Sequence, residues 1–472
     1  MRRILWITAA LLGLQGCGTQ PVDTSRGWEG KPRVIVMTDG EVDDRCSMVH
    51  FLLYANDMQV DAIIQSNSGF QCKGWSSEPW IEEQLAAYEQ LYPNLVVHDP
   101  DYPTADALRR VVFVGDEDPA HIPEGVNFKT LLPGHEVLID PTLWPDTPGS
   151  ERIVEVLLEE DPRPVFIQCW GGGNTAAKAF QKLKAAYPEE YDRAIRKAVL
   201  YCIWYQDGAG NYIEQHHPGA TILLSHHFSG SWDYGTLTNS DNFIRQYLQD
   251  TKNPLGKFYT QPFISEGDTP AFLYAIDNGM RSFEHPTYGG WGGRFYRVEG
   301  FENLYRDVSL GALREWIEPA LRDFQARLEW SMTPIYEEGN HAPVIEVEEG
   351  LDRVVKSGER VTLRARICDN DPRDVEGAWR IRGHMWQQKG RTYEWLASNP
   401  EQRIEEYRTD WSQMTAGSYP GYVDLQFEGK DQVSFTAPEV DTPQTIHILL
   451  EAYDMALPRM TSYARFIVTV VP

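Results

Sequence analysis

The sequence predicts an α/β domain with a mostly parallel, doubly wound sheet, followed by an all-β sandwich of immunoglobulin-like type. Three observations support this fold class. Strand-like and helix-like segments alternate from Lys31 to about residue 334, the composition changes after Tyr336, and only short alternating strands follow. Alternation of strand and helix implies a parallel sheet with helices on both faces. Because 472 residues exceed what one core usually serves, two folded domains are expected, at 31–336 and 343–472.

The elements of the first domain follow from local patterns. Short runs rich in apolar and β-branched residues predict strands at 33–37, 59–65, 111–115, 165–169 and 198–204. Helical patterns run through Ser47 to Leu53 and over 79–91, 153–159 and 176–187. In such sheets ligands bind beyond the carboxyl ends of the strands. The functional residues are therefore expected in the loops that directly follow strands.

The second domain begins after Asn340-His341-Ala342-Pro343, which is interpreted as a linker because Pro and small polar residues break helix and sheet. Strands are predicted at 344–347, 360–368, 378–385, 432–436, 445–453 and 464–470. In the second of these strands, apolar residues alternate with Thr and Arg, which is the period of a half-buried strand. Several such strands separated by turns predict a β-sandwich.

The N-terminus is typical of an exported protein. Arg2 and Arg3 precede an apolar run from Ile4 to Leu14, which is too short to span a bilayer as a helix. Gly16-Cys17 resembles the end of a bacterial lipobox, which implies a signal peptide over 1–17 and a lipidated Cys17. The alternative is an ordinary signal peptide with an incidental Cys. Residues 18–30 are small and polar, as in a tether, so the prediction is a periplasmic or cell-surface lipoprotein that meets the membrane only through this anchor.

Charge and cysteine content exclude several functions. The formal net charge of -26 opposes nucleic-acid binding, because affinity for phosphate backbones comes mainly from Lys and Arg. No Cys or His spacing indicates zinc. Export permits disulfides, and Cys46 with Cys72 is the candidate pair, whereas Cys169 and Cys202 lie in apolar runs typical of buried free thiols.

An acidic cluster follows the first predicted strand. Asp39, Glu41, Asp43 and Asp44 fall within six residues, and four ionised carboxylates in a desolvated cleft would repel one another. A hard cation resolves this repulsion, because carboxylate oxygens are its preferred ligands. The alternative is a solvated acidic turn that caps the next helix. The spacing alone leaves both interpretations open.

Three segments together resemble a known family. Residues 34–44, Val-Ile-Val-Met-Thr-Asp-Gly-Glu-Val-Asp-Asp, are similar to the N-terminal signature of inosine–uridine nucleoside hydrolases. Residues 168–175 resemble that family's Gly-rich loop, 266–270 resemble its late loop with a final Asp, and Asn67 matches a substrate-contacting Asn. With Trp291-Gly-Gly-Arg and the β-sandwich, nearly all of the mature chain resembles a bacterial exported family of cellulose-binding, nucleoside-hydrolase-like proteins.

The resemblance implies specific roles. Asp39, Asp44 and Asp268 would ligate Ca²⁺ together with the backbone carbonyl of Trp170, and Asp43 would hold ribose hydroxyls. Asp39 would also take a proton from a metal-bound water that attacks the anomeric carbon. The implied activity is calcium-dependent hydrolysis of N-glycosyl bonds, ribosyl or related, through an oxocarbenium-like transition state. The implied partner is a small-molecule glycoside or a carbohydrate, and an oligomer is possible.

The chain departs from the family pattern at three places, at one of which Gly40-Glu41 replaces Pro-Gly. Met37 stands where the family usually has its first Asp, and Gly267 stands where many members have a His that protonates a purine leaving group. These departures argue against a purine nucleosidase. The alternative function is a non-catalytic polysaccharide-binding surface protein, for which cellulose is the named ligand of the family.

Neighbouring loops add candidate substrate contacts. Asn174 ends the Gly-rich loop, while Gln206 and Asp207 follow the predicted strand 198–204, so all three are expected to face the cleft. The alternative for the latter two is a surface turn. Trp291 lies among glycines and is a candidate for stacking on a sugar ring, or else part of a structural turn.

The sandwich carries two further hypotheses. Trp379, Trp386 and Trp395 are a candidate stacking platform for a glycan, although aromatics of small β domains usually belong to the core. The acidic segment from Asp369 to Asp374 is either a cation-binding loop or a polar turn.

Overall fold

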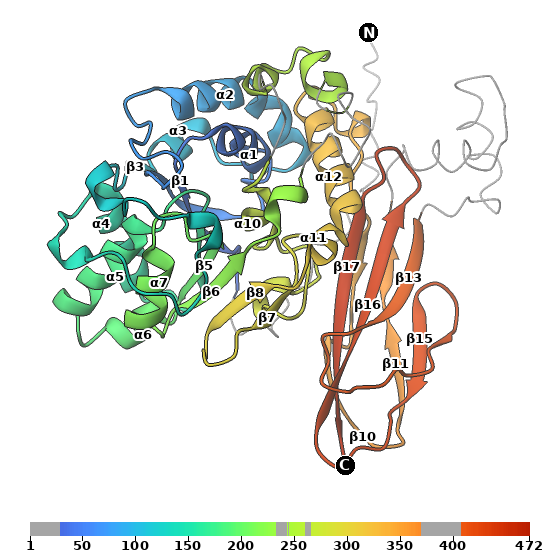
Figure 1. Cartoon of the computed structure of the whole chain (residues 1–472). Helices are drawn as coiled ribbons and strands as arrows, with labels where there is room; N and C mark the ends of the chain where they lie inside the picture. The colour runs from blue at the N-terminus through green and yellow to red at the C-terminus, as the bar shows by residue number, and fades with distance from the viewer. Residues whose placement is uncertain (1–28, 233–242, 244, 260–265, 370–406) are drawn as a thin grey trace, which may run out of the picture.

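The structure is a computed structural model that describes residues 29–232, 243, 245–259, 266–369 and 407–472. Figure 1 shows an α/β part, in which helices surround a central sheet, beside an elongated all-β part that ends at the C-terminus. Both match the predicted fold class. Within the described ranges, no helix combines the length and apolarity needed to cross a membrane. The predicted signal peptide, Cys17 and the tether up to residue 28 lie outside these ranges.

The central sheet has eight strands in the order β3-β2-β1-β4-β5-β6-β8-β7. All neighbours pair in parallel except β7 and β8, so the predicted mostly parallel sheet is confirmed. The strands are β1 (Arg33–Thr38), β2 (Gln59–Gln65), β3 (Val112–Val114), β4 (Val165–Cys169), β5 (Ala198–Ile203), β6 (Thr221–Ser225), β7 (Phe295–Arg297) and β8 (Leu304–Asp307).

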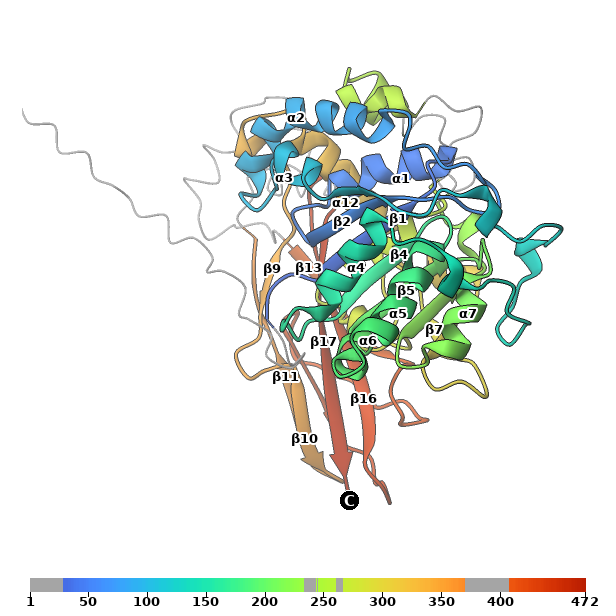
Figure 2. The same cartoon turned by 90° about the vertical axis from the view of Figure 1, so that its left-hand side faces the viewer.

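Helices cover both faces of this sheet. Alternate residues of β1 show the division, because Val34 and Val36 belong to one buried cluster whereas Ile35 and Met37 belong to the other. The first cluster packs under α1 (Val42–Leu52), α2 (Trp80–His98), α10 (Thr269–Leu273) and α12 (Ile317–Trp330). The second packs under α4 (Pro148–Leu158), α5 (Asn174–Ala186), α6 (Tyr191–Ile195) and α7 (Ala209–His216), which lie in front in Figure 2. Two short helices, α3 (Ala105–Arg109) and α11 (Leu310–Arg314), complete the set named in the figures.

The chain changes direction across the sheet at β1. This strand pairs with β2 on one side and with β4 on the other, and Met37 lies opposite both Ile64 and Cys169. The loops after β1 and β4 therefore leave the sheet side by side. Ligands of doubly wound sheets bind at such a switch point, so the acidic loop and the Gly-rich loop lie in the expected place.

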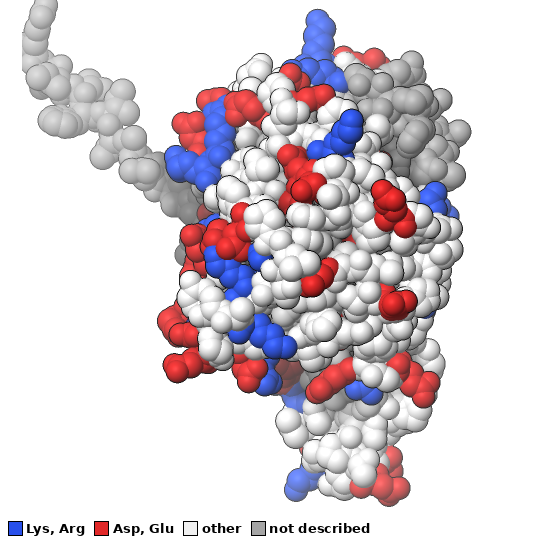
Figure 3. Space-filling model, turned by 60° about the vertical axis from the view of Figure 1, so that its left-hand side comes forward, with Lys and Arg blue, Asp and Glu red and all other residues white. Residues whose placement is uncertain are grey.

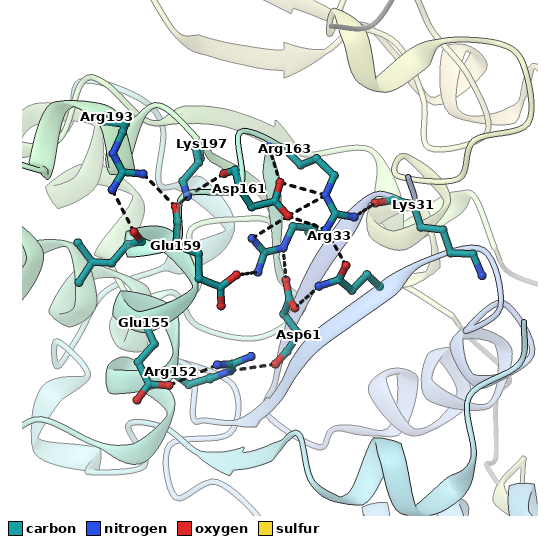
Figure 4. Close-up of polar contacts among 12 residues, drawn as sticks. Lys31, Arg33, Asp61, Arg152, Glu155, Glu159, Asp161, Arg163, Arg193 and Lys197 are labelled. Carbon is teal, nitrogen blue, oxygen red and sulfur yellow. Dashed lines mark hydrogen bonds and ion pairs between the residues drawn. The ribbon is translucent and has the colours of Figure 1, made fainter. Parts of the chain in front are cut away.

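An ionic network covers the opposite end of the sheet, where β1 and β4 begin (Figure 4). The Arg33 side chain is fully buried and donates hydrogen bonds to Asp61 and to Glu159, both at 2.7 Å. Arg163 donates to Asp161 and to the Lys31 carbonyl, which ties the segment before β4 to the start of β1. A buried Arg is stable only with such partners. This end of the sheet therefore stabilises the fold.

Figure 3 shows how charged side chains are distributed on one face of the molecule. On the face shown in Figure 3, Lys and Arg side chains are interspersed with Asp and Glu and form no continuous basic patch.

The C-terminal part is all-β. Its described strands form a four-stranded sheet β10-β17-β16-β13, a three-stranded sheet β11-β15-β14 and the pair β12-β9. The predicted strand 360–368 is divided between two sheets, because its first half pairs with β15 and its second half with β9. The strands are β9 (Val344–Glu346), β10 (Asp352–Lys356), β11 (Arg360–Arg364), β12 (Arg366–Cys368), β13 (Tyr407–Met414), β14 (Gln426–Phe427), β15 (Gln432–Thr436), β16 (Gln444–Asp454) and β17 (Thr461–Val471).

The two parts share one buried core. Leu449, Met460 and Tyr463 of the all-β part belong to the same apolar cluster as Phe324 of α12. The Tyr463 N–H donates to the Asn278 carbonyl at 3.2 Å. The segment interpreted as a linker is a fixed connection, because the Asn340 side chain is fully buried and hydrogen-bonded.

The five cysteines within the described ranges are free thiols. The candidate disulfide between Cys46 and Cys72 does not form, because Cys46 on α1 is buried in the core and Cys72 is exposed. Cys169 and Cys202 are buried thiols, as predicted, and lie side by side on β4 and β5. The candidate tryptophans 379, 386 and 395, and the acidic segment beyond Asp369, lie outside the described residues.

Candidate active site and cation site

The acidic loop after β1 folds its carboxylates inward. The Thr38 hydroxyl and the Asp39 N–H, the latter at 3.1 Å, both donate to Oδ1 of Asp44. Asp44 lies in the first turn of α1 and is only 2% exposed. The N-cap residue Glu41 makes no side-chain capping bond. A solvated acidic turn that caps the helix therefore does not describe this loop.

Three carboxylates converge at the carboxyl end of the sheet. Oxygen atoms of Asp43, Asp44 and Asp268 all lie within 4.8 Å of one another. Ligand oxygens about 2.3–2.6 Å from a shared Ca²⁺ can lie up to about 5 Å apart, so the spacing fits one ion. Oδ2 of Asp268 is buried and has no hydrogen-bond partner among the described residues, which is the state expected of an atom that awaits a cation. The donor set is all oxygen, as a hard cation requires.

Burial and mutual repulsion disturb the acidity of this cluster. Burial, followed by the charge of Asp39, raises the pKa of Asp43 to about 6. Burial and the charges of Asp39 and Asp43 raise the pKa of Glu41 to about 7. The pKa values of Asp44 and Asp268 are raised as well, mainly by burial. Without a cation the cluster keeps protons that ordinary carboxyls lose near pH 4.

Asp39 lies directly beside this cluster rather than within it. Its side chain is 2% exposed and accepts a hydrogen bond from the Glu41 N–H at 3.2 Å. It packs against Gly171 so closely that an added Cβ there would lie 2.7 Å from Cβ and Cγ of Asp39. The Gly-rich loop thus lacks a side chain where the two loops meet.

The carbonyl of Trp170, expected as a metal ligand, already accepts a hydrogen bond. Nε2 of Gln206 donates to it at 2.6 Å and also donates to the Ile203 carbonyl at 2.8 Å. A cation at the Trp170 carbonyl would require this amide to turn away. The structure brings Trp170 and Gln206 together with Asp44 and Asp268 around one pocket, as the sequence-based placement expected.

The pocket has a volume of about 230 Å³ and two unlike walls. Carboxylates form one wall, and Phe70, Trp204 and Phe228 form much of the other. The rings of Trp204 and Phe228 meet edge to face at 4.7 Å, and Nζ of Lys129 lies 5.7 Å from the Trp204 ring. Trp204 has a φ of 57°, a strained conformation for a large side chain that is typical of functional sites.

Sequence reasoning missed this aromatic wall. Trp204 directly follows β5, so its position after a strand was a usable signal. Phe70 and Phe228 also lie shortly after strands, β2 and β6, although β6 was not among the predicted strands. Lys129 carried no signal, since it lies in the long connection between β3 and β4.

Three other candidate residues hold the loops behind the pocket and do not contribute to its described lining. The Asp207 carboxylate accepts hydrogen bonds from the backbone N–H groups of Asn174 at 2.7 Å and Ala209 at 2.9 Å. Asn67 donates from Nδ2 to the carbonyls of Cys72 and Asp118, both at 3.1 Å. The hydrogen bonds of Asp207 hold the N-terminal ends of α5 and α7 next to the site.

Trp291 lies at the contact between the two parts of the chain rather than in the pocket. It is 4% exposed, and its Nε1 donates to the Tyr463 hydroxyl at 3.3 Å. Its glycine neighbours permit close packing, since a Cβ at Gly292 would meet the Tyr274 backbone at 2.4 Å. The structural turn is thus the better description of this segment.

Comparison with known families gives two matches. Residues 33–295, more than half of the chain, match the family described as cellulose-binding Sde182, nucleoside hydrolase-like domain. Residues 398–470 match the C-terminal domain of cellulose-binding protein Sde0182.

Among solved structures, a nucleoside hydrolase-related protein from Saccharophagus degradans that is associated with carbohydrate metabolism is 25% identical. The match covers 93% of this chain and 100% of that one, with a TM-score of 0.75. Effector proteins XOO4466 and XopQ, the latter with adenosine diphosphate ribose, reach TM-scores of 0.33 and 0.35 at 11% and 10% identity. They cover 64% of this chain and 92% and 95% of their own lengths. No curated protein matches the chain.

Proposed function

The chain belongs to the cellulose-binding Sde182 family with a nucleoside hydrolase-like domain, and from its acidic pocket we propose a calcium-dependent hydrolase of N-glycosyl bonds, ribosyl or related. The observation that carries the proposal is the convergence of Asp43, Asp44 and Asp268, with one buried carboxylate oxygen left without a partner. We further propose that the protein is exported and held at a membrane through Cys17.

The residues divide the chemistry between them. Asp44 and Asp268 would hold the cation, and Asp43, which lines the pocket, would bind sugar hydroxyls. When bound, the cation would lower the pKa of a water molecule in its shell. Asp39, buried beside Gly171, would accept a proton from the attacking water, since its raised pKa makes it a better base than an exposed Asp. The aromatic wall would cover the leaving group.

The late loop has no His at position 267 that could protonate the leaving group. Gly267 lies next to Asp43, since a Cβ there would approach Oδ2 of Asp43 to 2.7 Å. A side chain at this position would displace that carboxylate. The substrate is therefore proposed to have a leaving group that departs without a His at this position.

The test is release of a ribosylated chromophore by the full chain with and without Ca²⁺. Asp39→Asn should lower kcat at least about a hundredfold, as loss of a positioned base does, while KM changes little. Asp106→Asn, an exposed carboxylate on α3, is the matched control and should keep full activity. Equal rates with calcium and with a chelator would contradict the proposal.

A second candidate function is non-catalytic binding of polysaccharide. The hydrogen bond from Gln206 to the Trp170 carbonyl favours it, because that bond occupies one expected metal ligand. The family's description as cellulose-binding also supports it. Cation binding without turnover of any N-glycoside, together with cellulose binding, would favour this candidate over the hydrolase.

A further inference from the structure

We propose that a groove between α12 and the β16–β17 hairpin binds a neutral oligosaccharide, at a site separate from the acidic pocket. The groove has a volume of about 570 Å³, against about 230 Å³ for the pocket, and no described residue lines both. Sites for small ligands usually measure about 300–1,000 Å³. Figure 1 shows α12 beside β17, so the groove lies where the two parts of the chain meet.

Each part of the chain supplies one wall. Glu318, Arg322 and Gln325 project from α12, while Glu451 and Tyr453 come from β16. The segment that joins β16 to β17 adds Leu457, Pro458 and Arg459. Neither part alone would form the site.

The charge of the groove favours a neutral ligand. Two arginines and two glutamates line it, so its formal charges cancel. Arg322 and Glu318 already pair at 2.7 Å. Arg459 and Glu451 form no ion pair among the described residues, so their hydrogen-bonding capacity is available to a ligand. An anion or a cation would be repelled by one of them, whereas sugar hydroxyls can donate to Glu and accept from Arg.

Aromatic surface accompanies these polar groups. Tyr247 and Tyr453 are both half-buried at the groove, and the Arg459 guanidinium lies 4.9 Å from the centre of the Tyr453 ring. Flat aromatic and guanidinium surfaces pack against the apolar faces of pyranose rings, while their polar ends bind hydroxyls. This combination distinguishes a sugar site from a groove that is only apolar.

The two walls are held in place before any ligand binds. Nε1 of Trp330, at the end of α12, donates to the Asn340 carbonyl at 2.7 Å. The Asn340 side chain in turn donates to Oδ2 of Asp454 at 2.6 Å and to the Pro458 carbonyl at 2.7 Å. One buried residue thus connects both walls. A preformed site saves the entropy of ordering it on binding.

The inference rests on the carbohydrate ligand proposed above, but not on hydrolysis. Cellulose, the ligand in the family's description, is an uncharged chain of pyranose rings, which is the chemistry that the groove fits. The inference places the glycan at the junction of the two parts of the chain rather than on the all-β part alone.

The test measures binding of the full chain to microcrystalline cellulose by sedimentation and to cellohexaose by calorimetry. Arg459→Ala and Arg322→Ala should each weaken binding at least tenfold. Arg360→Ala, an exposed arginine on β11, and Tyr422→Ala, with a side chain 74% exposed, are matched controls and should bind within twofold of wild type. Unchanged melting temperature and calcium affinity would show that the groove variants are folded.

Three results would overturn the inference. The first is cellulose and cellohexaose binding that is unaffected by either groove variant, or absent from the wild-type chain. The second is an equal loss with Tyr422→Ala, which would place the glycan elsewhere on the sandwich. The third is loss of binding with Asp268→Asn, which would place it in the acidic pocket. Absent hydrolysis with intact groove binding would contradict only the enzymatic proposal.

Discussion

The carboxylates of Asp43, Asp44 and Asp268 lie within 4.8 Å of one another, and none forms an ion pair with Lys, Arg or His among the described residues. Like charges at this separation in a desolvated site oppose folding unless protons or a cation neutralise them. The same arrangement therefore predicts opposite effects on stability and on binding when one charge is removed.

Replacing Asp268 by Asn should separate these two effects. Without a cation, Asp268→Asn is expected to raise the free energy of unfolding by about 1 kcal/mol, because a buried Asn needs neither a proton nor a cation to be neutral beside the other two carboxyls. Calcium affinity should fall at least tenfold, because one ligand charge is lost. Denaturant titration and calorimetry give the two readouts.

The control for this prediction is Asp424→Asn, an exposed carboxylate in the C-terminal part. It should change neither quantity beyond about 0.5 kcal/mol. A destabilised Asp268→Asn variant with wild-type calcium affinity would show that Asp268 is structural.

Single residues also show how far the sequence leads. The place of Asp44 was predictable because it follows the first strand, and that of Asp268 because residues 266–270 resemble the family's late loop. The capture of the Trp170 carbonyl by Gln206 was not, since it depends on a side-chain rotamer set by packing between β4 and β5. Trp291 was misplaced for a similar reason, because its partner Tyr463 lies 172 residues further along the chain.

At the scale of elements, the Gly-rich loop after β4 approaches the acidic loop without side chains. Gly171→Ala would place a Cβ 2.7 Å from Cβ and Cγ of Asp39, and a real Cβ does not approach so closely. The variant should lose about 1–3 kcal/mol of stability and bind calcium more weakly, as one loop must shift.

The matched substitution is Gly311→Ala on α11, where an added Cβ would meet only Oγ of Ser309 at 3.5 Å. It should leave stability within about 1 kcal/mol of wild type, or raise it, because Ala favours helix over Gly. Equal losses at both positions would contradict a special role for the loop contact.

His217, at the end of α7, predicts that the stability of the fold depends on pH. His217 is 1% exposed, and burial, followed by the charges of Lys184 and His216, lowers its pKa to about 3 from an unfolded value near 6.5. Between these values the unfolded chain binds the proton and the folded chain does not. His217 thus costs no stability above pH 6.5, and stability falls as the pH drops from there toward 3, by about 1.4 kcal/mol per pH unit.

Urea titrations of His217→Gln at pH 7 and pH 5 measure this effect. At pH 7 the variant should have a lower free energy of unfolding than wild type, since it loses the 2.8 Å hydrogen bond with the Tyr191 hydroxyl. Between pH 7 and pH 5 it should lose less stability than wild type. The exposed neighbour in His216→Gln should keep the wild-type slope. Identical slopes for His217→Gln and wild type would refute the buried neutral His.

The helices and strands were easier to predict from the sequence than single side-chain contacts were. β2 and β4 have the predicted bounds, because short segments rich in apolar and β-branched residues between turn residues are typical of strands. The run 360–368 was predicted as one strand but divides, because its change of sheet depends on partners β15 and β9. Alternation within a strand contains no information about such partners.

At the scale of the whole molecule, the two parts share a core and are tied by polar contacts. Arg281 is 4% exposed and pairs with Asp352 of β10 at 2.8 Å. Leu449, Met460 and Tyr463 complete the apolar cluster of the α/β part. The sequence predicted two domains with a linker, but not this contact, since a composition change marks a boundary without showing what packs across it.

The shared core predicts that both parts unfold together. Scanning calorimetry of the chain should give one transition, with a calorimetric enthalpy equal to the van't Hoff enthalpy. Asp352→Asn should lower the melting temperature of that single transition, because it leaves a buried Arg with fewer partners. Two separate transitions in the wild-type chain would show that the parts are energetically independent.

The cation site is the central claim, and anomalous diffraction tests it most directly. Crystals grown with Ca²⁺ should give one anomalous peak at the carboxyl end of the sheet, about 2.3–2.6 Å from oxygens of Asp44 and Asp268. Its distance from the Trp170 carbonyl will show whether the Gln206 amide has turned away. Crystals with calcium bound elsewhere, and only water among these carboxylates, would contradict the claim.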